Sequence, residues 1–100
     1  MEPRRHAPVP VTLVAGFLGA GKTTFLNRIL AGEHGRRIAV LVNDFGDVSV
    51  DRELIIAADE TTITLANGCV CCTIRDDLVA AARDLLRREP PPEHLVVELS

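Results

Sequence analysis

The first chemically distinctive stretch of the sequence is residues 16–24, which read Gly-Phe-Leu-Gly-Ala-Gly-Lys-Thr-Thr. This order fits G-x-x-x-x-G-K-[ST], the pattern of a phosphate-binding P-loop. Glycines allow a tight turn that points backbone N–H groups at phosphate oxygens. We expect a nucleotide to be bound by one set of residues, which are Gly16, Gly19, Ala20, Gly21, Lys22, Thr23 and Thr24.

Two side chains of this segment have separate roles in the expected chemistry. Lys22 would reach the β- and γ-phosphates as a point charge, and the Thr23 hydroxyl would ligate Mg²⁺. The alternative is a glycine-rich turn that fits the pattern by chance. The flanking residues argue against it, because 11–15 have strand composition and 22–31 have helical spacing. A helix that starts at the loop would add the positive end of its dipole to the site.

Acidic residues follow two predicted strands. The apolar run at 38–42 shows no alternation, which indicates a strand buried on both faces, and the polar loop after it contains Asp44 and Asp47. Residues 94–98 form another strand that closes on Glu98, the place of a Walker B carboxylate. Because ligands of open α/β sheets bind beyond the carboxyl ends of the strands, we expect both positions to face the P-loop.

These acidic residues complete the predicted nucleotide site. Lys22, Asp44 and Glu98 are the expected catalytic residues. Glu98 would hold Mg²⁺ together with Thr23, or position the attacking water. Two simpler interpretations stay open, an Asx turn at Asp44 that only caps the strand and a solvated carboxylate at Glu98.

The residues Cys69, Cys71 and Cys72 place three thiols within four positions. A tight loop could turn two or three thiolates onto one Zn²⁺ or Co²⁺, with water, a histidine, a client or a second chain completing the coordination. Alternatively, Cys69 and Cys72 form a redox C-x-x-C, or all three are small apolar core residues. The spacing favours the metal site. His34 and His94 are expected at the surface.

The other segments predict an α/β fold, a P-loop NTPase with a mainly parallel sheet flanked by helices. Three or four strands are expected, with 61–66 at an edge, while 51–58 fits either a helical turn or a strand. A clear second helix spans 74–89, with aspartates in its first turn and arginines in its last. The first helix has one apolar stripe, formed by Phe25, Leu26, Ile29 and Leu30.

Composition limits the classes of partner. The 47% of hydrophobic residues supports a core, and a net charge of −3 gives no electrostatic footprint for nucleic acid. No apolar run approaches the roughly 20 residues of a membrane helix. Three clustered cysteines do not suit a disulfide framework, which favours a reducing compartment, hence the cytoplasm. We expect 1–10 to be a disordered leader and 11–100 to be the N-terminal part of a nucleotide-binding domain, truncated after the Walker B strand.

Four segments taken together resemble one family, the CobW-like P-loop GTPases, relatives of the hydrogenase and urease nickel-insertion GTPases. They are G-F-L-G-A-G-K-T-T, N-D-F-G-D-V-S-V-D, N-G-C-V-C-C-T-I-R-D-D-L and V-V-E-L-S. The resemblance runs from about residue 11 to residue 100, and 67–78 is its most specific part. The sequence departs from the family's pattern at Asp44 and Asp47, where Glu is common, and at Leu99, which replaces the frequent Thr or Ser.

The resemblance implies an activity and its partners. GTP would be bound and slowly hydrolysed with Mg²⁺, and Cys69, Cys71 and Cys72 would match the family's metal-binding C-x-C-C. Zinc, or cobalt in some members, would be delivered to a metal-receiving client protein, with a homodimer as one assembly and no nucleic acid or membrane involved. The preference for GTP rests on the resemblance alone, because the guanine-reading N-K-x-D segment does not occur in these residues. The alternatives are a P-loop ATPase or kinase with a redox C-x-x-C, and a non-catalytic nucleotide-binding fragment.

Overall fold

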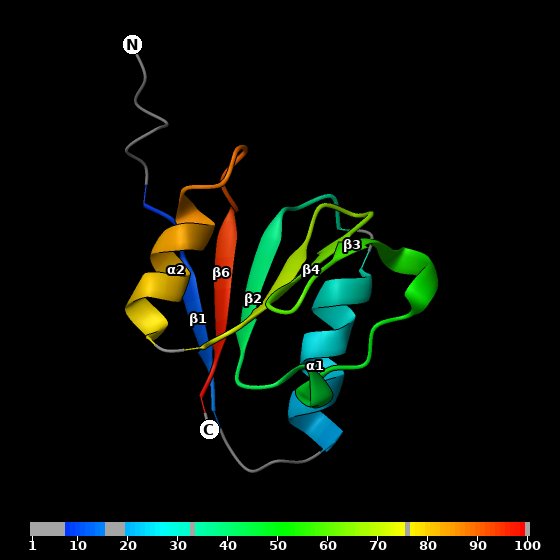
Figure 1. Cartoon of the computed structure of the whole chain (residues 1–100). Coiled ribbons are helices and arrows are strands. Elements are labelled where there is room, and N and C mark those ends of the chain that lie inside the picture. The colour runs from blue at the N-terminus through cyan, green and yellow to red at the C-terminus, as the bar shows by residue number, and fades with distance from the viewer. Residues whose placement is uncertain (1–7, 16–19, 33, 76, 100) are drawn as a thin grey trace.

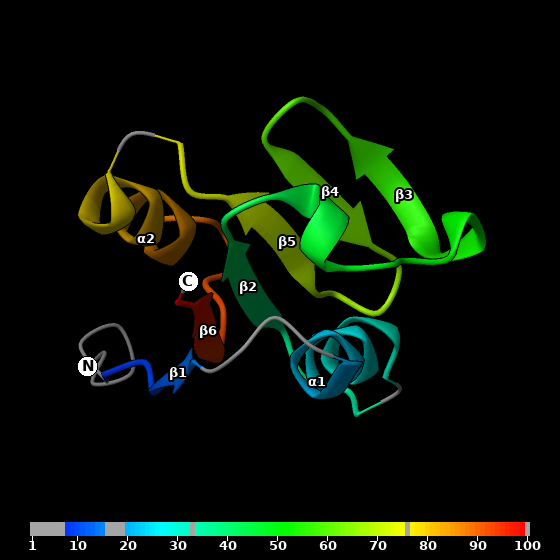
Figure 2. The same cartoon turned by 90° about the horizontal axis from the view of Figure 1, so that it is seen from below.

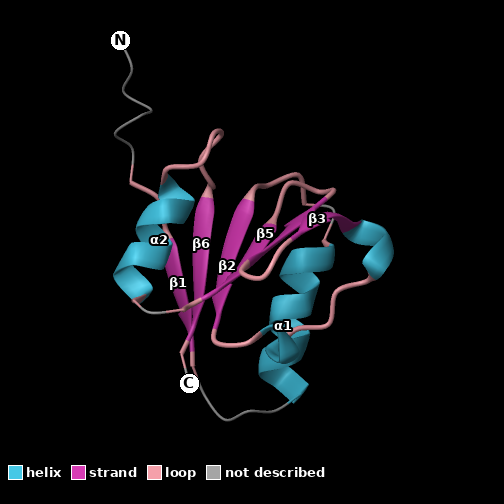
Figure 3. Ribbon diagram, viewed as in Figure 1, coloured by secondary structure: helices cyan, strands magenta, loops and turns pink. Residues whose placement is uncertain are grey.

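The computed structural model describes residues 8–15, 20–32, 34–75 and 77–99 of the chain. Its regular elements are β1 (Val11–Val14), α1 (Ala20–Ala31), β2 (Ile38–Val42), β3 (Ile55–Ala58), β4 (Thr62–Leu65), β5 (Val70–Thr73), α2 (Leu78–Leu86) and β6 (His94–Glu98). Two short 3-10 helices, η2 (Phe45–Asp47) and η3 (Arg52–Leu54), lie between β2 and β3. Figures 1 and 3 show one sheet with a helix on either side.

The sheet has the strand order β1-β6-β2-β5-β4-β3. β1, β6, β2 and β5 are parallel, whereas β4 runs antiparallel to β5 and β3 antiparallel to β4. The predicted α/β class with a mainly parallel sheet is therefore confirmed. The expected three or four strands are too few, because 55–58 and 70–73 are also strands.

The prediction of an edge strand at 61–66 is wrong. β4 lies between β5 and β3, and β3 occupies the edge. The alternation in this segment reports that one face of the strand is more covered than the other, and it carries no information about neighbours within the sheet. At the opposite edge, β1 exposes 55% of Val11 and 60% of Leu13.

The two faces of the sheet carry separate cores, which Figure 2 shows with α1 and α2 on opposite sides. On one face, Leu26 and Leu30 of α1 pack against Val40 and Val42. On the other, Leu85 of α2 joins a cluster with the alternate residues of β2. β2 is thus buried on both faces, as predicted. The buried apolar stripe of α1 is narrower than predicted, because Phe25 is 44% exposed.

The helix α2 is shorter than the predicted 74–89. Ile74 N–H donates to the Val42 carbonyl at 2.9 Å, so the chain is still following the sheet at that position. Asp77 then caps the helix, accepting a hydrogen bond from Val79 N–H at 2.9 Å. A cap side chain bonds to the first free N–H groups, which fixes the start at Leu78.

Part of the predicted leader belongs to the described chain. The Pro10 carbonyl accepts a hydrogen bond from Leu95 N–H at 2.9 Å, and Val9 packs against the core under α2. Residues 1–7 lie outside the described residues. None of the helices in the described segments has the length and apolar content needed to cross a bilayer.

Candidate nucleotide site and cysteine segment

Lys22 and Glu98 meet at the carboxyl ends of the parallel strands. Lys22 lies in the first turn of α1, and Glu98 closes β6 beside Val14 of β1. The lysine Nζ lies 3.4 Å from Glu98 Oε2 and donates to the Leu99 carbonyl at 3.2 Å. The side chains are 6% and 1% exposed. The structure therefore brings the predicted P-loop lysine and the strand-end carboxylate together in a buried ion pair.

Asn43, which the sequence interpretation missed, holds Glu98 in place. Its backbone N–H donates to Glu98 Oε1 at 3.0 Å, and its Nδ2 donates to the Glu98 backbone carbonyl at 3.3 Å. Asn43 directly follows β2, and β2 pairs with β6. A polar residue at the end of a strand beside the Walker B strand is the signal that could have identified it.

Asp47 is the acidic residue that the loop after β2 brings to Glu98. A hydrogen bond to Glu98, followed by burial and repulsion from the same carboxylate, raises the pKa of Asp47. Burial on its own would raise the pKa of Glu98, but the Asn43 N–H, Asp47 and Lys22 outweigh it and lower that pKa. The contact therefore shifts the two pKa values in opposite directions.

Asp44, predicted as a catalytic residue, has a different arrangement. Its side chain is exposed, and its Oδ1 accepts a hydrogen bond from Gly46 N–H at 2.6 Å. This contact makes Asp44 the cap of η2. The simpler alternative of an Asx turn at this position is what the structure contains.

The other predicted phosphate-binding residues lie on the first turn of α1 or before it. Gly21 and Thr24 are exposed there, and Thr23 is half-buried. Gly16 and Gly19 lie outside the described residues, and only the backbone of Ala20 is described.

The oxygen atoms at this end of the sheet fit a magnesium ion. Glu98 Oε2 is buried and accepts no hydrogen bond from the described residues. A second carboxyl group, that of Asp47, lies beside it, and the Thr23 hydroxyl is on the helix turn that also carries Lys22. Mg²⁺ takes oxygen ligands and is commonly bound by one or two carboxylates plus phosphate.

The cysteine segment is a strand, so the prediction of a tight loop is wrong. Cys71 and Cys72 are consecutive residues of β5, and side chains alternate between the faces of a sheet. Cys69 and Cys71 belong to the core under α1, whereas Cys72 belongs to the core under α2. All three are buried free thiols. Among the described residues, no group of three or more His, Cys, Asp or Glu side chains is arranged to hold a metal ion.

Cys69 contacts the end of α1. Its Sγ donates to the Arg36 carbonyl at 3.5 Å and lies 3.8 Å from His34 Nε2. The neighbouring Asn67 donates from Nδ2 to the Leu30 carbonyl at 2.9 Å. The start of the cysteine segment is thus bonded to the helix that follows the P-loop.

The two histidines differ in their surroundings. His34 is exposed, as predicted, although its ring also contacts Cys69. His94 is not a surface residue, because it is half-buried with Nε2 at 2.7 Å from the Thr12 hydroxyl. That contact joins β6 to β1.

Burial keeps the thiols protonated in this arrangement. Burial raises the pKa of Cys69 and Cys72, and burial together with the charges of Cys72 and Glu98 raises the pKa of Cys71 to about 12. Cys69 and Cys72 face opposite sides of the sheet, so the predicted redox C-x-x-C is not formed here. The structure corresponds to the third alternative, in which the cysteines pack as core residues.

Three features define a P-loop nucleotide-binding protein. They are the strand β1, the helix α1 with Lys22 in its first turn, and the buried Glu98 carboxylate that ends the adjacent parallel strand. Comparison with known families narrows this class. The chain belongs to the family of CobW/HypB/UreG nucleotide-binding domains, which matches residues 10–100. The resemblance that the motifs indicated is confirmed.

Relatives in this family include zinc chaperones. The zinc chaperone CobW of Sinorhizobium sp is 40% identical over 98 residues, covering 92% of this chain and 28% of the relative. The zinc chaperone YjiA of Escherichia coli (strain K12) is 53% identical over 79 residues, covering 79% and 25%. The crystal structure of Zn(II)-bound YjiA GTPase superimposes with a TM-score of 0.69 at 45% identity, over 92% of this chain and 30% of that one. The chain thus spans less than a third of the length of these relatives.

Proposed function

We propose that this chain is the N-terminal part of the nucleotide-binding domain of a GTP-dependent zinc metallochaperone. The observation that carries the proposal is the buried ion pair between Lys22 and Glu98 at the carboxyl ends of β1 and β6. A cation and a carboxylate sealed from water at this position are the groups that a P-loop enzyme uses to hold a nucleoside triphosphate. Membership of a family whose relatives are named GTPases and zinc chaperones supports GTP and zinc as ligands.

Phosphoryl transfer to water would occur through positioning and charge, without a covalent intermediate. Lys22 exchanges its contact with Glu98 for one with the β- and γ-phosphates. Glu98, held by Asn43, and the neighbouring Asp47 then orient the attacking water beside the γ-phosphate. Bound Mg²⁺, held by Thr23 and Glu98, would supply positive charge to the phosphate oxygens.

Zinc, or alternatively cobalt, would be the cargo of the Cys69, Cys71 and Cys72 segment. Thiolates are ligands that both ions accept. Because Cys71 and Cys72 face opposite sides of β5, binding of one ion by all three requires the start of this strand to detach from the sheet. The metal-binding state is therefore a rearranged form of the segment, with deprotonated thiols.

The route from the nucleotide to the cysteines is short. Glu98 is bonded to Asn43 at the end of β2, and Val40 of β2 is paired in register with Cys71 of β5. We propose that the γ-phosphate orders the loop that contains Asp44 and Asp47 and thereby shifts the cysteine segment. By linkage, metal binding then changes nucleotide affinity by the same factor. Zinc would pass to a client protein in the cytoplasm, and a homodimer could present two such segments.

The experiment is an anaerobic zinc titration of the reduced chain against a chromophoric chelator, with Mg²⁺ and GTP, with GDP, and without nucleotide. We expect stoichiometric binding whose affinity differs between the nucleotide states. The matched variant is Cys69→Ser/Cys71→Ser/Cys72→Ser, which should lose binding while circular dichroism reports its fold. Equal zinc affinity in all three nucleotide states would refute the coupling, and unchanged binding in the variant would refute the cargo site.

The choice of nucleotide needs its own measurement. On the complete gene product, which would include the guanine-reading segment, displacement of a fluorescent GTP analogue by unlabelled GTP and ATP should show tighter binding of GTP, and Lys22→Ala should abolish binding of the analogue. Preferential displacement by ATP would contradict the proposed GTPase.

A further inference from the structure

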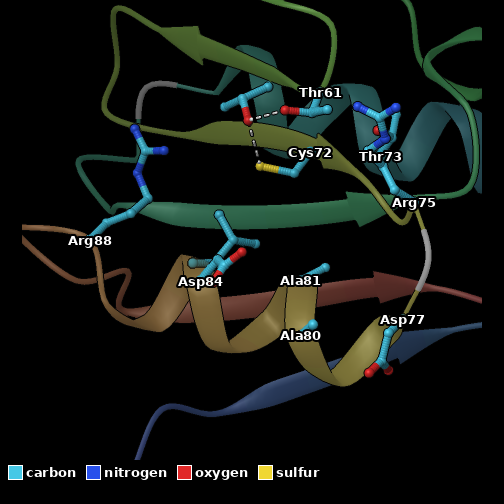
Figure 4. Close-up of a pocket in the computed structure, with 11 residues that line it drawn as sticks. Thr61, Cys72, Thr73, Arg75, Asp77, Ala80, Ala81, Asp84 and Arg88 are labelled. Atoms are coloured by element: carbon cyan, nitrogen blue, oxygen red, sulfur yellow. Dashed lines mark hydrogen bonds between the residues drawn. The ribbon is translucent and has the colours of Figure 1, made fainter.

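A cavity lies on the face of the sheet that carries α2, away from Lys22 and Glu98. It has a volume of about 360 Å³ and is enclosed by β4, β5, the segment after β5, and one side of α2. Figure 4 shows it between the strand that carries Cys72 and the helix that carries Ala81 and Asp84. Ligand pockets start at about 300 Å³, so this volume suits a molecule much smaller than a nucleotide.

Charges of both signs line the cavity. Arg75 and Arg88 lie toward its opposite ends, and Asp84 lies on the helix one turn before Arg88. Asp84 belongs to α2, whereas Arg88 follows the end of that helix; the two form no ion pair within 4 Å, nor does either pair within that distance with another described residue. Asp77, which also lines the cavity, is committed to capping α2. The Asp84 carboxylate and the two guanidinium groups therefore line the same space without an ion pair to a described residue, and the carboxylate of Asp59 acts on Arg88 only from beyond that distance.

The sheet side of the cavity is polar as well. Thr61 and Thr62 present hydroxyl groups that lie 3.3 Å apart, and Cys72 Sγ donates to Thr62 Oγ1 at 3.5 Å. Cys72 is 8% exposed, whereas Cys69 and Cys71 are fully buried. Of the three thiols, Cys72 is the one that opens onto a space where a ligand would fit.

We propose that this cavity binds a small zwitterion of the α-amino acid class, with its carboxylate at Arg88 and its ammonium group at Asp84. The side chain of the ligand points toward Thr62 and Cys72, where a hydroxyl or thiol finds both donors and acceptors. A purely anionic or purely cationic ligand would leave one of the two charges unmatched. This site is separate from the nucleotide site, and it stands or falls independently of the proposed GTPase.

The test uses L-serine as the probe and two analogues that each lack one charge. ¹⁵N amide spectra of the full chain are recorded during titration with L-serine, ethanolamine and 3-hydroxypropionate. We expect saturable shifts at residues around the cavity for L-serine, and binding at least tenfold weaker for each analogue. Equal binding of either analogue overturns the assignment of a zwitterion, and no saturable shift with L-serine overturns the site.

Variants and a chemical readout make the test specific. Arg88→Gln should weaken L-serine binding at least tenfold, while Arg87→Gln, which changes a neighbour lining the other side of α2, should not. L-Serine at ten times its dissociation constant should slow alkylation of Cys72 by iodoacetamide about tenfold, because about one site in eleven stays empty. Equal losses in the two arginine variants, or protection that persists in Arg88→Gln, would overturn the proposal.

Discussion

Asn67 joins the cysteine segment to the end of α1, and replacing it by alanine tests that connection. Its Nδ2 donates to the Leu30 carbonyl at 2.9 Å and the Gly32 carbonyl at 2.8 Å, and its Oδ1 accepts from Cys69 N–H at 3.0 Å. At about 1 kcal/mol net for each bond, their loss lowers the free energy of unfolding by about 3 kcal/mol. Because Asn67 is half-buried, water replaces part of the lost hydrogen bonding, and the expected loss in the free energy of unfolding is about 2 kcal/mol.

Asn67→Asp separates the hydrogen bonds from the charge. Aspartate keeps the acceptor for Cys69 N–H, loses both donors, and places a negative charge against the carbonyl end of α1. A charge of that sign at a helix C-terminus costs about 0.3–1 kcal/mol more. Asn67→Asp should therefore lose about as much stability as Asn67→Ala at pH 7, although it keeps one of the three hydrogen bonds. Asn27→Ala, which removes one bond to Ser49 N–H, is the control and should cost about 1 kcal/mol.

The assay is urea denaturation at pH 7, followed by circular dichroism, with the three variants compared at a common slope. The reasoning is refuted if Asn67→Ala loses less than Asn27→Ala, or if Asn67→Asp is as stable as the unmodified chain. Either result would mean that Asn67 does not hold the helix end as the structure indicates.

Three further predictions concern the buried polar groups. Lys22→Met leaves the Glu98 carboxylate without its cation, so urea denaturation should show a loss of about 3–5 kcal/mol that Lys22→Met/Glu98→Gln largely restores; equal losses would contradict this. The pKa of Asp47 is higher in the folded chain than in the unfolded chain, so the folded chain holds the Asp47 proton more tightly. The free energy of unfolding therefore falls as pH rises through the raised pKa. Asp47→Asn should remove this fall from a denaturation series between pH 4 and 7, and an unchanged profile would argue against it. At pH 8 under native conditions, Cys71 should react with iodoacetamide more slowly than Cys72, because Cys71 is fully buried and burial raises its pKa to about 12; mass mapping that finds equal labelling would refute the buried arrangement.

Much of the nucleotide site could be predicted because its signals are local. The P-loop pattern fixes a strand, a turn and a helix start in sequence order, and the apolar runs at 38–42 and 94–98 need no partner to be identified as buried strands. Glu98 was found in this way. Asn43 was not singled out, and Asp44 was chosen over Asp47 as the catalytic residue, because which polar residue of a loop reaches Glu98 depends on how η2 turns, and that turn is set by Asp44 capping.

The cysteine segment could not be predicted from its own residues. Four positions containing three thiols are compatible with a metal loop, a redox pair or a core strand, and the choice is made by pairing with β2 and β4. Those partners are 31 and 8 positions away in register for Cys71, which lies opposite Val40 and Ile63. Similarly, residues 55–58 form a strand because they pair with β4, and no pattern within these residues predicts that pairing.

Among the strands of the described residues, β1 has a neighbour on one side only, and this edge has a consequence for handling the protein. Its backbone N–H and C=O groups on the side away from β6 face outward, and the exposed apolar side chains Val11 and Leu13 stand beside those of α2, such as Val79, which is 61% exposed. An apolar strand with a free edge is a template for adding another strand. Preparations of this chain should therefore precipitate or form strand-linked assemblies as concentration rises. Leu13→Lys would place a positive charge on this edge and thereby keep the protein in solution.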